Sequence, residues 1–130
     1  MRVICHGIDL VDCRRIAELA DRHGRRFLDR IFTSAEQAYG NRHRRSAERW
    51  AGRFAVKEAV MKMTGTGWQN GIAWTDIETV NDSAGKPTVR LSGMIAELAH
   101  RMGIRQISVS ITHTSDLAIA SAIALGDDPA

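Results

Sequence analysis

The sequence has little cysteine, no long apolar run and few aromatic residues, and each shortage excludes a class of protein. Its two cysteines, Cys5 and Cys13, are too few and too irregularly spaced for a disulfide framework or a zinc site, which favours reduced structural thiols. No uncharged apolar run approaches the roughly 18 residues that a membrane span needs. Arg2, His6 and Asp9 interrupt the first apolar stretch, so we expect no signal peptide and a cytoplasmic protein.

The composition is that of a globular protein. Hydrophobic residues make up 44% and charged residues 25% of the 130 positions. This length is sufficient for one core, and we therefore expect a single domain over residues 1–130.

The charges are unevenly distributed along the chain. From Arg14 to Lys62 there are thirteen Lys and Arg against six acids, a balance of +7, and the remaining residues carry −4. A concentrated positive field favours a nucleic acid, a phosphorylated ligand or an acidic protein as partner. A solvated basic face without a dedicated partner is an equally good interpretation.

Periodicity predicts one strand and then several helices in the first half. β-Branched and apolar residues predict a strand over 2–11, and Asp12 is a suitable N-cap for a helix that ends at Gly24. A short helix is expected over 27–31. Two more follow, one from the capping box of Thr33 and Glu36 to Gly40, and a long one from Ser46 to Gly65.

The second half is richer in strands. Strands are predicted over 75–80 and 88–91, then a helix over 92–102, and two more strands over 106–112 and 117–124. The fold class is therefore α+β, with an antiparallel sheet packed around a long buried helix. The apolar strand over 117–125 is either a core strand or a surface shared with another copy.

The long helix contains charges in an unusual position. Its sequence FAVKEAVMKMTGTG places Glu58 and Lys62 in the middle of an apolar face. A second apolar strip lies on the far side, which leaves mainly Arg53 and Lys57 for the remaining arc. The two faces are formed by Ala51, Phe54, Ala55 and Met61, and by Val56, Val60 and Met63.

A simple ion pair between Glu58 and Lys62, four residues apart, is one explanation for these charges. It does not explain their place in an apolar face, where desolvation is costly unless further partners exist. The glycines at 65 and 67 either only end the helix or expose backbone amides to phosphate oxygens.

Two other segments place polar groups in or beside strands. Asp9 lies within the first strand, where a carboxylate pairs with a cation, caps a neighbour or binds a metal. The hydroxyls of Ser108, Ser110 and Thr112 share one strand face beside His113. That face either binds a polar ligand or is the solvent side of an edge strand.

The order of these segments is more informative than any one of them. GIDLVD, then FAVKEAVMKMTGTG, GKP and VSITHT resembles the holo-acyl-carrier-protein synthase family, the small 4′-phosphopantetheinyl transferases, from about Val3 to Ala124. The resemblance implies that family's fold and its reaction in fatty acid biosynthesis. These enzymes transfer phosphopantetheine from coenzyme A to a serine of apo acyl carrier protein and release adenosine 3′,5′-bisphosphate.

The resemblance also assigns roles to residues. Asp9 and Glu58 match the carboxylates that bind Mg²⁺, a cation that prefers oxygen ligands. Lys62 matches the lysine beside the pyrophosphate, and Glu58 is the expected general base, acting directly or through water. The nucleotide and its phosphates are expected to contact Arg53, Lys62, Gly65, Thr66, Gly67, Lys86, Pro87, His113 and Thr114.

Partners follow from the same resemblance. The acidic acyl carrier protein is expected to dock on Arg15, Arg22 and Arg26, with Arg14 and Arg25 as substitutes. Family members are typically homotrimers with the site between subunits.

Two other functions are compatible with parts of the sequence. A small basic nucleic-acid-binding domain would explain the charge between 14 and 53, but not Asp9, Glu58 or the Gly-Thr-Gly loop, and the aromatic residues typical of single-strand binding are missing. The second alternative is a module that binds coenzyme A without transferase activity. We expect neither nucleic acid nor membrane as a partner.

Overall fold

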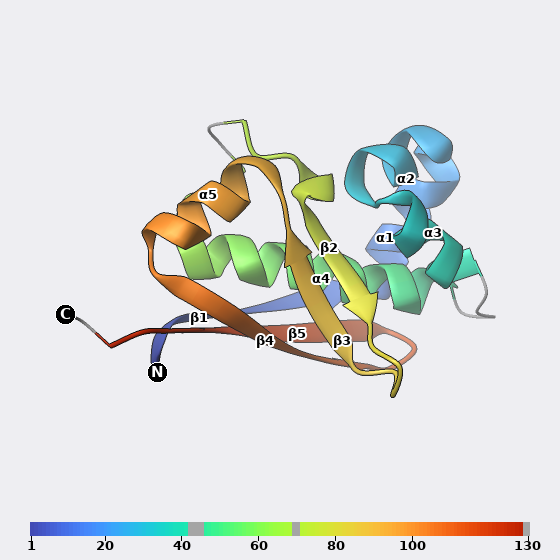
Figure 1. Ribbon diagram of the computed structural model, residues 1–130. Helices are drawn as coiled ribbons and strands as arrows, with labels where there is room; N and C mark the ends of the chain where they lie inside the picture. Colours follow the sequence, from blue (N-terminus) through green and yellow to red (C-terminus); the bar gives the residue numbers. More distant parts are fainter. Residues whose placement is uncertain (42–45, 69–70, 129–130) are drawn as a thin grey trace.

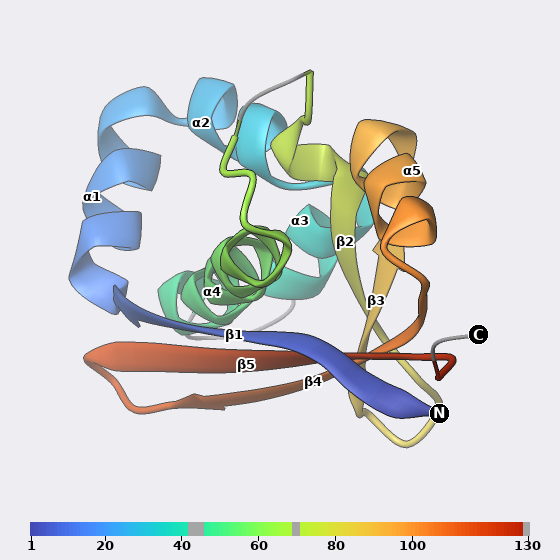
Figure 2. The same cartoon turned by 90° about the vertical axis from the view of Figure 1, so that its left-hand side faces the viewer.

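The longest helix lies across one face of an antiparallel sheet. The computed structural model describes residues 1–41, 46–68 and 71–128. Strands β1 (Arg2–Asp12), β4 (Ile104–His113) and β5 (Leu117–Gly126) form a sheet in the order β1-β5-β4, and α4 (Ser46–Thr64) packs on it (Figures 1 and 2). The predicted α+β class is confirmed.

A second, two-stranded sheet lies beside α4. It consists of β2 (Ile77–Asn81) and β3 (Pro87–Leu91), and the 3₁₀ turn η1 (Trp74–Asp76) and helix α5 (Gly93–Arg101) flank it. The predicted strand over 75–80 starts two residues late. Asp76 is the reason, because its side chain accepts a hydrogen bond from Ala73 N at 3.1 Å and so holds the preceding turn.

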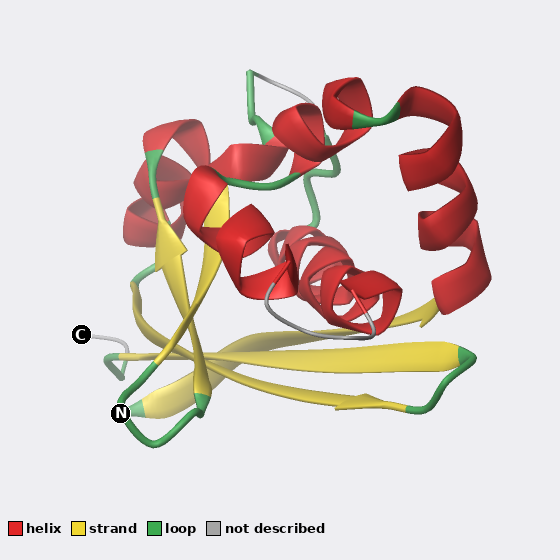
Figure 3. Cartoon of the chain, turned by 90° about the vertical axis from the view of Figure 1, so that its right-hand side faces the viewer, coloured by secondary structure: helices red, strands yellow, loops and turns green. Residues whose placement is uncertain are grey.

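Three short helices follow β1. They are α1 (Cys13–His23), α2 (Arg25–Ile31) and α3 (Ser34–Asn41), and in Figure 3 the helices of the described residues lie on one side of the three-stranded sheet. Asp12 caps α1 as predicted, through Arg14 N at 2.9 Å. The capping box is also confirmed, with Thr33 N to Glu36 Oε1 at 3.0 Å and Glu36 N to Thr33 Oγ1 at 3.2 Å.

Gly40 does not end α3, contrary to the sequence-based prediction. The helix continues to Asn41, and Gly40 is buried against Trp50. A Cβ atom at Gly40 would lie 2.0 Å from Trp50 Nε1, so close packing rather than helix termination requires glycine there.

Lys57 is the largest departure from the helical-wheel prediction, which placed it with Arg53 on an arc away from both apolar strips. Its side chain is 0% exposed, and Nζ lies 2.8 Å from Glu36 Oε1. It also donates to the carbonyl oxygens of Trp74 and Ile77. Burial lowers the pKa of Lys57, and the paired carboxylate opposes that shift. Removing one partner of such a pair typically costs about 3–5 kcal/mol.

The pair is buried because α4 is covered on this side as well. Glu36 belongs to α3, and its second oxygen accepts from the backbone N–H of Thr79 in β2 at 3.0 Å. Arg53, on the same arc, is only 4% exposed. The wheel identified two apolar sides correctly, but it placed Lys62 within one of them, and that side chain is 56% exposed because it reaches outward to Asp9. The third side of α4 is buried through polar contacts.

The two faces of β5 differ. Its alanines at 118, 120, 122 and 124 are buried, whereas Leu117, Ile119 and Ile123 on the other face are between 36% and 41% exposed. Ile8 and Leu10 of the neighbouring β1 are more exposed than these three residues, at 60% and 59%. The segment over 117–125 is thus a core strand on one face and an exposed apolar surface on the other.

No helix within the described ranges is both long and apolar enough to cross a membrane.

The contact of β1 with α4 depends on Gly7. A Cβ atom at this position would lie 2.1 Å from the carbonyl oxygen of Ala59 and 2.9 Å from Met63 N. Both contacts are with helix backbone, which cannot move aside as a side chain can.

We therefore predict that Gly7→Ala lowers the free energy of unfolding by about 3 kcal/mol, since overpacking typically costs about 1–3 kcal/mol. Gly103→Ala is the control. Its φ of +79° disfavours a side chain, but the nearest atom, Ile4 Cδ1, lies 3.9 Å away, so a loss of about 1 kcal/mol is expected. Urea unfolding measures both, and equal losses would contradict the steric argument.

Candidate active site

A carboxylate cluster forms where β1 crosses the C-terminal half of α4. Asp9 lies two residues beyond Gly7, and its Oδ1 is 2.8 Å from Lys62 Nζ. Lys62 also donates to the carbonyl oxygen of Ile8 at 3.2 Å. Lys62 is thus paired with Asp9, and the simple Glu58–Lys62 pair is absent from the ion pairs of the described residues.

Glu58 is partly buried beside this pair. Desolvation raises the pKa of its carboxyl, and the negative charge of Asp9 raises it further. The indole of Trp68 and the charges of Lys62 and Arg15 act in the opposite direction. Two carboxylates that repel each other are stabilised by a cation between them or by a proton on one of them.

The donor set fits a magnesium ion. Mg²⁺ is usually bound through one or two carboxylates, and waters and substrate phosphates fill its other positions. Asp9 and Glu58 supply such a pair. The described residues contain no cluster of three or more His, Cys, Asp and Glu, as an all-protein zinc site would need.

The Gly-Thr-Gly loop follows this end of α4. Gly65 N bonds to Met61 O at 3.1 Å, and φ is +77° at Gly65 and +64° at Gly67. The hydroxyls of Thr64 and Thr66 lie 3.3 Å apart. Gly65 therefore ends the helix as predicted, and both glycines are exposed beside the carboxylate cluster.

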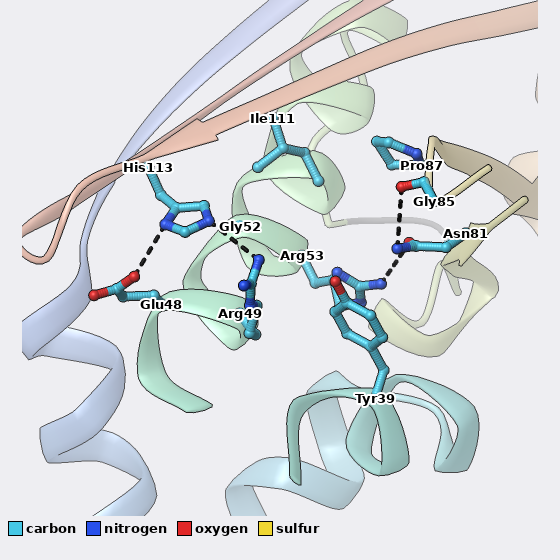
Figure 4. Close-up of a pocket in the computed structure, with 10 residues that line it drawn as sticks. All are labelled: Tyr39, Glu48, Arg49, Gly52, Arg53, Asn81, Gly85, Pro87, Ile111 and His113. Atoms are coloured by element: carbon cyan, nitrogen blue, oxygen red, sulfur yellow. Dashed lines mark hydrogen bonds and ion pairs between the residues drawn. The ribbon is translucent and has the colours of Figure 1, made fainter. Parts of the chain in front are cut away.

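A second cluster lies at the N-terminal half of α4, in the pocket of Figure 4. Arg53 Nη2 donates to Asn81 Oδ1 at 2.8 Å, and Arg49 Nη1 lies 3.3 Å from His113 Nε2. On the other side of its ring, His113 Nδ1 lies 3.0 Å from Glu48 Oε2, but the two are not aligned for a hydrogen bond. The lining residues are Tyr39, Glu48, Arg49, Gly52, Arg53, Asn81, Gly85, Pro87, Ile111 and His113.

Sequence reasoning identified only part of this pocket. Of the predicted nucleotide-binding residues, the pocket is lined by Arg53, Pro87 and His113. It is not lined by Lys86 and Thr114, which are next to Pro87 and His113 in the sequence. The hydroxyl of Thr114 instead accepts from Asp116 N and Leu117 N and shapes the β4–β5 turn. Arg49, four residues before Arg53, could have been found from that spacing.

Tyr39 and Asn81 also line the pocket, and no local motif indicated either of them. The hydroxyl-bearing face of β4 is not part of it. β4 is an edge strand, and Ser110 and Thr112 are exposed.

The two clusters face different directions from the same helix. Nine residues separate Arg53 from Lys62, about 14 Å along the axis, and Glu58 is rotated about 140° from Arg53. None of the residues that line the pocket belongs to the carboxylate cluster. One chain therefore does not bring together all of the residues that the sequence predicts for the site.

A third feature is a basic-rimmed apolar pocket between α1, α2 and α4. It measures about 480 Å³ and is lined by Arg15, Leu19, His23, Arg26, Phe27, Arg30, Ile31, Phe54 and Trp74. The sequence predicted Arg15 and Arg26 for docking. Arg22 is exposed on the last turn of α1 but does not line the pocket, and the apolar floor was not predicted.

The predicted substitutes Arg14 and Arg25 are exposed and lie outside this pocket. Each is 3.9 Å from a nearby carboxylate, that of Asp12 and that of Asp29 respectively.

Comparison with known proteins gives one consistent match. A sequence model of the 4′-phosphopantetheinyl transferase superfamily matches residues 6–121. The holo-[acyl-carrier-protein] synthase of Solibacter usitatus is 44% identical over 121 residues, which is 93% of this chain and 97% of that protein. That of Koribacter versatilis is 44% identical over 117 residues, or 90% and 94% of the two chains.

Solved structures agree with the sequence comparison. The holo-[acyl-carrier-protein] synthase of Neisseria meningitidis has a TM-score of 0.86 and 28% identity, covering 95% of this chain and 99% of its own. The synthase of Bacillus anthracis, in complex with CoA (3′,5′-ADP), has a TM-score of 0.78 and 31% identity, covering 96% and 98%. The chain therefore belongs to the holo-[acyl-carrier-protein] synthases of the 4′-phosphopantetheinyl transferase superfamily.

Proposed function

We propose that this enzyme transfers 4′-phosphopantetheine from coenzyme A to a serine of an apo acyl carrier protein of fatty acid biosynthesis and releases adenosine 3′,5′-bisphosphate. The observation that carries the proposal is the cluster of Asp9, Glu58 and Lys62. These residues occupy the two segments that most resemble the family. They form a charged cluster at the contact of β1 and α4, where Asp9 and Glu58 are partly buried and Lys62 is exposed. Relatives named for this activity are 44% identical.

The reaction requires a base for the serine hydroxyl and positive charge for the leaving phosphate. The serine oxygen attacks the pyrophosphate phosphorus of coenzyme A, a new P–O bond forms, and the bond to the bisphosphate leaving group breaks. Glu58 accepts the hydroxyl proton, directly or through water. Lys62 neutralises charge on the leaving phosphate, and Asp9 orients Lys62.

Asp9 and Glu58 are the residues that would hold Mg²⁺. When bound, the ion supplies positive charge to the pyrophosphate.

We also propose that the site is shared between copies of the chain in a homotrimer. The carboxylate cluster and the Arg53–His113 pocket do not meet within one chain, so a ligand that contacts both must lie between two chains. The exposed apolar residues of β1 and β5, including Ile8 and Leu10, provide a surface for such assembly. Gly65, Thr66 and Gly67 of one chain then contact the phosphates, and Arg53, Lys86, Pro87, His113 and Thr114 of the next surround the nucleotide.

The basic-rimmed pocket is the proposed docking surface for the acidic carrier. Phe27, Phe54 and Trp74 provide an apolar floor for a carrier side chain, and Arg15 and Arg26 provide positive charge at the rim. Arg22 extends the positive surface along α1. Complementary charge of this kind raises the association rate and fixes orientation.

The first functional prediction concerns Glu58. Incubation with coenzyme A, Mg²⁺ and an apo acyl carrier protein should add the mass of phosphopantetheine to the carrier, as measured by mass spectrometry. Glu58→Gln should slow this by about 100-fold or more, because a general base contributes roughly 10²–10⁴-fold. Glu97→Gln, at an exposed glutamate of α5, is the control and should leave the rate unchanged. Wild-type turnover by Glu58→Gln would refute the assignment.

The second prediction concerns docking. Arg15→Glu combined with Arg22→Glu should lower kcat/KM for the carrier by about tenfold at low salt, and less at high salt, because the effect is electrostatic. The affinity for coenzyme A should not change. Arg2→Glu combined with Arg105→Glu makes the same change of charge near Asp127, away from the pocket, and serves as the control. Equal losses in the two variants would indicate a net-charge effect.

The third prediction tests the shared site. Glu58→Gln and the double variant Arg53→Ala/His113→Ala should each be nearly inactive alone. Coexpressed in equal amounts, they should recover about a quarter of wild-type activity, because random assembly pairs the two intact halves at one site in four. If mixed assemblies are isolated and show no recovery, both halves belong to one chain.

A further inference from the structure

Arg53 is a buried cation without a carboxylate partner. Arg53 is only 4% exposed, and the described residues contain no carboxylate within ion-pair distance of its guanidinium. Burial lowers the pKa of Arg53, Tyr39 and the charge of Glu36 oppose that shift, and the like charge of Arg49, one turn before it on α4, adds to it. The Nε atom of Arg53 is buried without a hydrogen-bond partner. Such an arrangement is costly unless an anion completes it.

Asn81 fixes one edge of the Arg53 guanidinium. Its Oδ1 accepts from Nη2 at 2.8 Å, and its Nδ2 donates to the carbonyl oxygen of Gly85 at 3.3 Å (Figure 4). Only one orientation of the amide satisfies both contacts. Asn81 thereby connects Arg53 to the loop that joins β2 and β3, which also carries Lys86.

Tyr39 supports the flat face of the same guanidinium. Its ring centre lies 3.6 Å from Arg53 Cζ. Stacking on an aromatic ring restricts the guanidinium plane, and a hydrogen bond with the neutral Tyr39 side chain opposes the lowering of the Arg53 pKa. The ring and the amide together fix the orientation of Arg53 without neutralising its charge.

We propose that Tyr39 and Asn81 are positioning residues that hold Arg53 for a phosphate monoester, and that they thereby set the preference of the enzyme for a nucleotide with a 3′-phosphate. This inference rests on the proposed function, in which the Arg53 pocket receives the nucleotide of coenzyme A. A neutral amide at position 81 is central to it. A carboxylate in the same place would hold Arg53 equally well but would cancel the charge that binds the phosphate.

The test compares two nucleotides by titration calorimetry, adenosine 3′,5′-bisphosphate and adenosine 5′-monophosphate. The wild-type protein should bind the bisphosphate at least about tenfold more tightly, the value of one charge-assisted hydrogen bond. Asn81→Ala should weaken bisphosphate binding by about tenfold and Tyr39→Leu by a few-fold. Neither should change the affinity for the monophosphate, which also reports that the variants are folded.

Asn81→Asp distinguishes positioning for an anion from support of the fold. It retains a partner for Arg53 but neutralises it, so bisphosphate binding should be weaker than with Asn81→Ala. Thr88→Ala is the matched control, because it removes the hydrogen bond from its hydroxyl to Val80 O on the same hairpin and should change neither affinity.

Three results would overturn the proposal. These are equal wild-type affinities for the two nucleotides, parallel weakening of both in the variants, and bisphosphate binding by Asn81→Asp that equals or exceeds that of Asn81→Ala. The measurement does not require phosphopantetheine transfer. A missing nucleotide preference would therefore leave the transferase proposal standing, and a missing transferase activity would leave the preference measurable.

Discussion

The backbone of β1 approaches α4 at Gly7 so closely that the carbonyl oxygen of Ala59 occupies the space of a side chain. Asp9 follows two residues later on the same face of the strand, and Lys62 lies one helical turn after Glu58, so this contact determines how the three charges meet. A larger separation between strand and helix would admit water and relax the repulsion between the carboxylates. The perturbed carboxyl of Glu58 is thus a consequence of backbone packing as much as of side-chain identity.

The opposite side of α4 is fixed by a different interaction. Lys57 and Glu36 form a buried ion pair whose remaining hydrogen bonds reach the backbone of η1 and β2. Buried charges are tolerated when such additional bonds satisfy them. The neighbouring residues Lys57 and Glu58 therefore contact different parts of the fold. Lys57 joins α4 to α3 and β2, whereas Glu58 faces β1. α4 therefore carries one fully buried charge that holds the fold together and one partly buried charge that belongs to the carboxylate cluster.

Most of the elements could be predicted from the sequence because their signals are local. Asp12 and the pair of Thr33 and Glu36 cap helices through residues two or three positions away, and Gly65 ends α4 through a neighbour four positions away. Apart from the start of β2, which the local bond from Ala73 N to Asp76 delays, the errors concern contacts that are not local. Nothing near Gly40 indicates Trp50, and nothing near Lys57 indicates the backbone of β2. Tyr39 and Asn81 were missed for the same reason, because their partner Arg53 is distant from both in the sequence.

The family motif predicts which residues belong to the functional site, but not which of them lie in contact within one chain. It places Arg53 and Lys62 on one helix, and the helix separates them by about 14 Å and turns them to different sides. A coenzyme A molecule is long and carries its charged groups at intervals, so a ligand of this kind suits two separated clusters, one of carboxylates that would hold Mg²⁺ and one of arginines, better than one compact pocket. In the proposed assembly, the exposed apolar residues of β1 and β5 bring the halves together. Catalysis then requires association, and the surface that drives association does not need to contain any catalytic group.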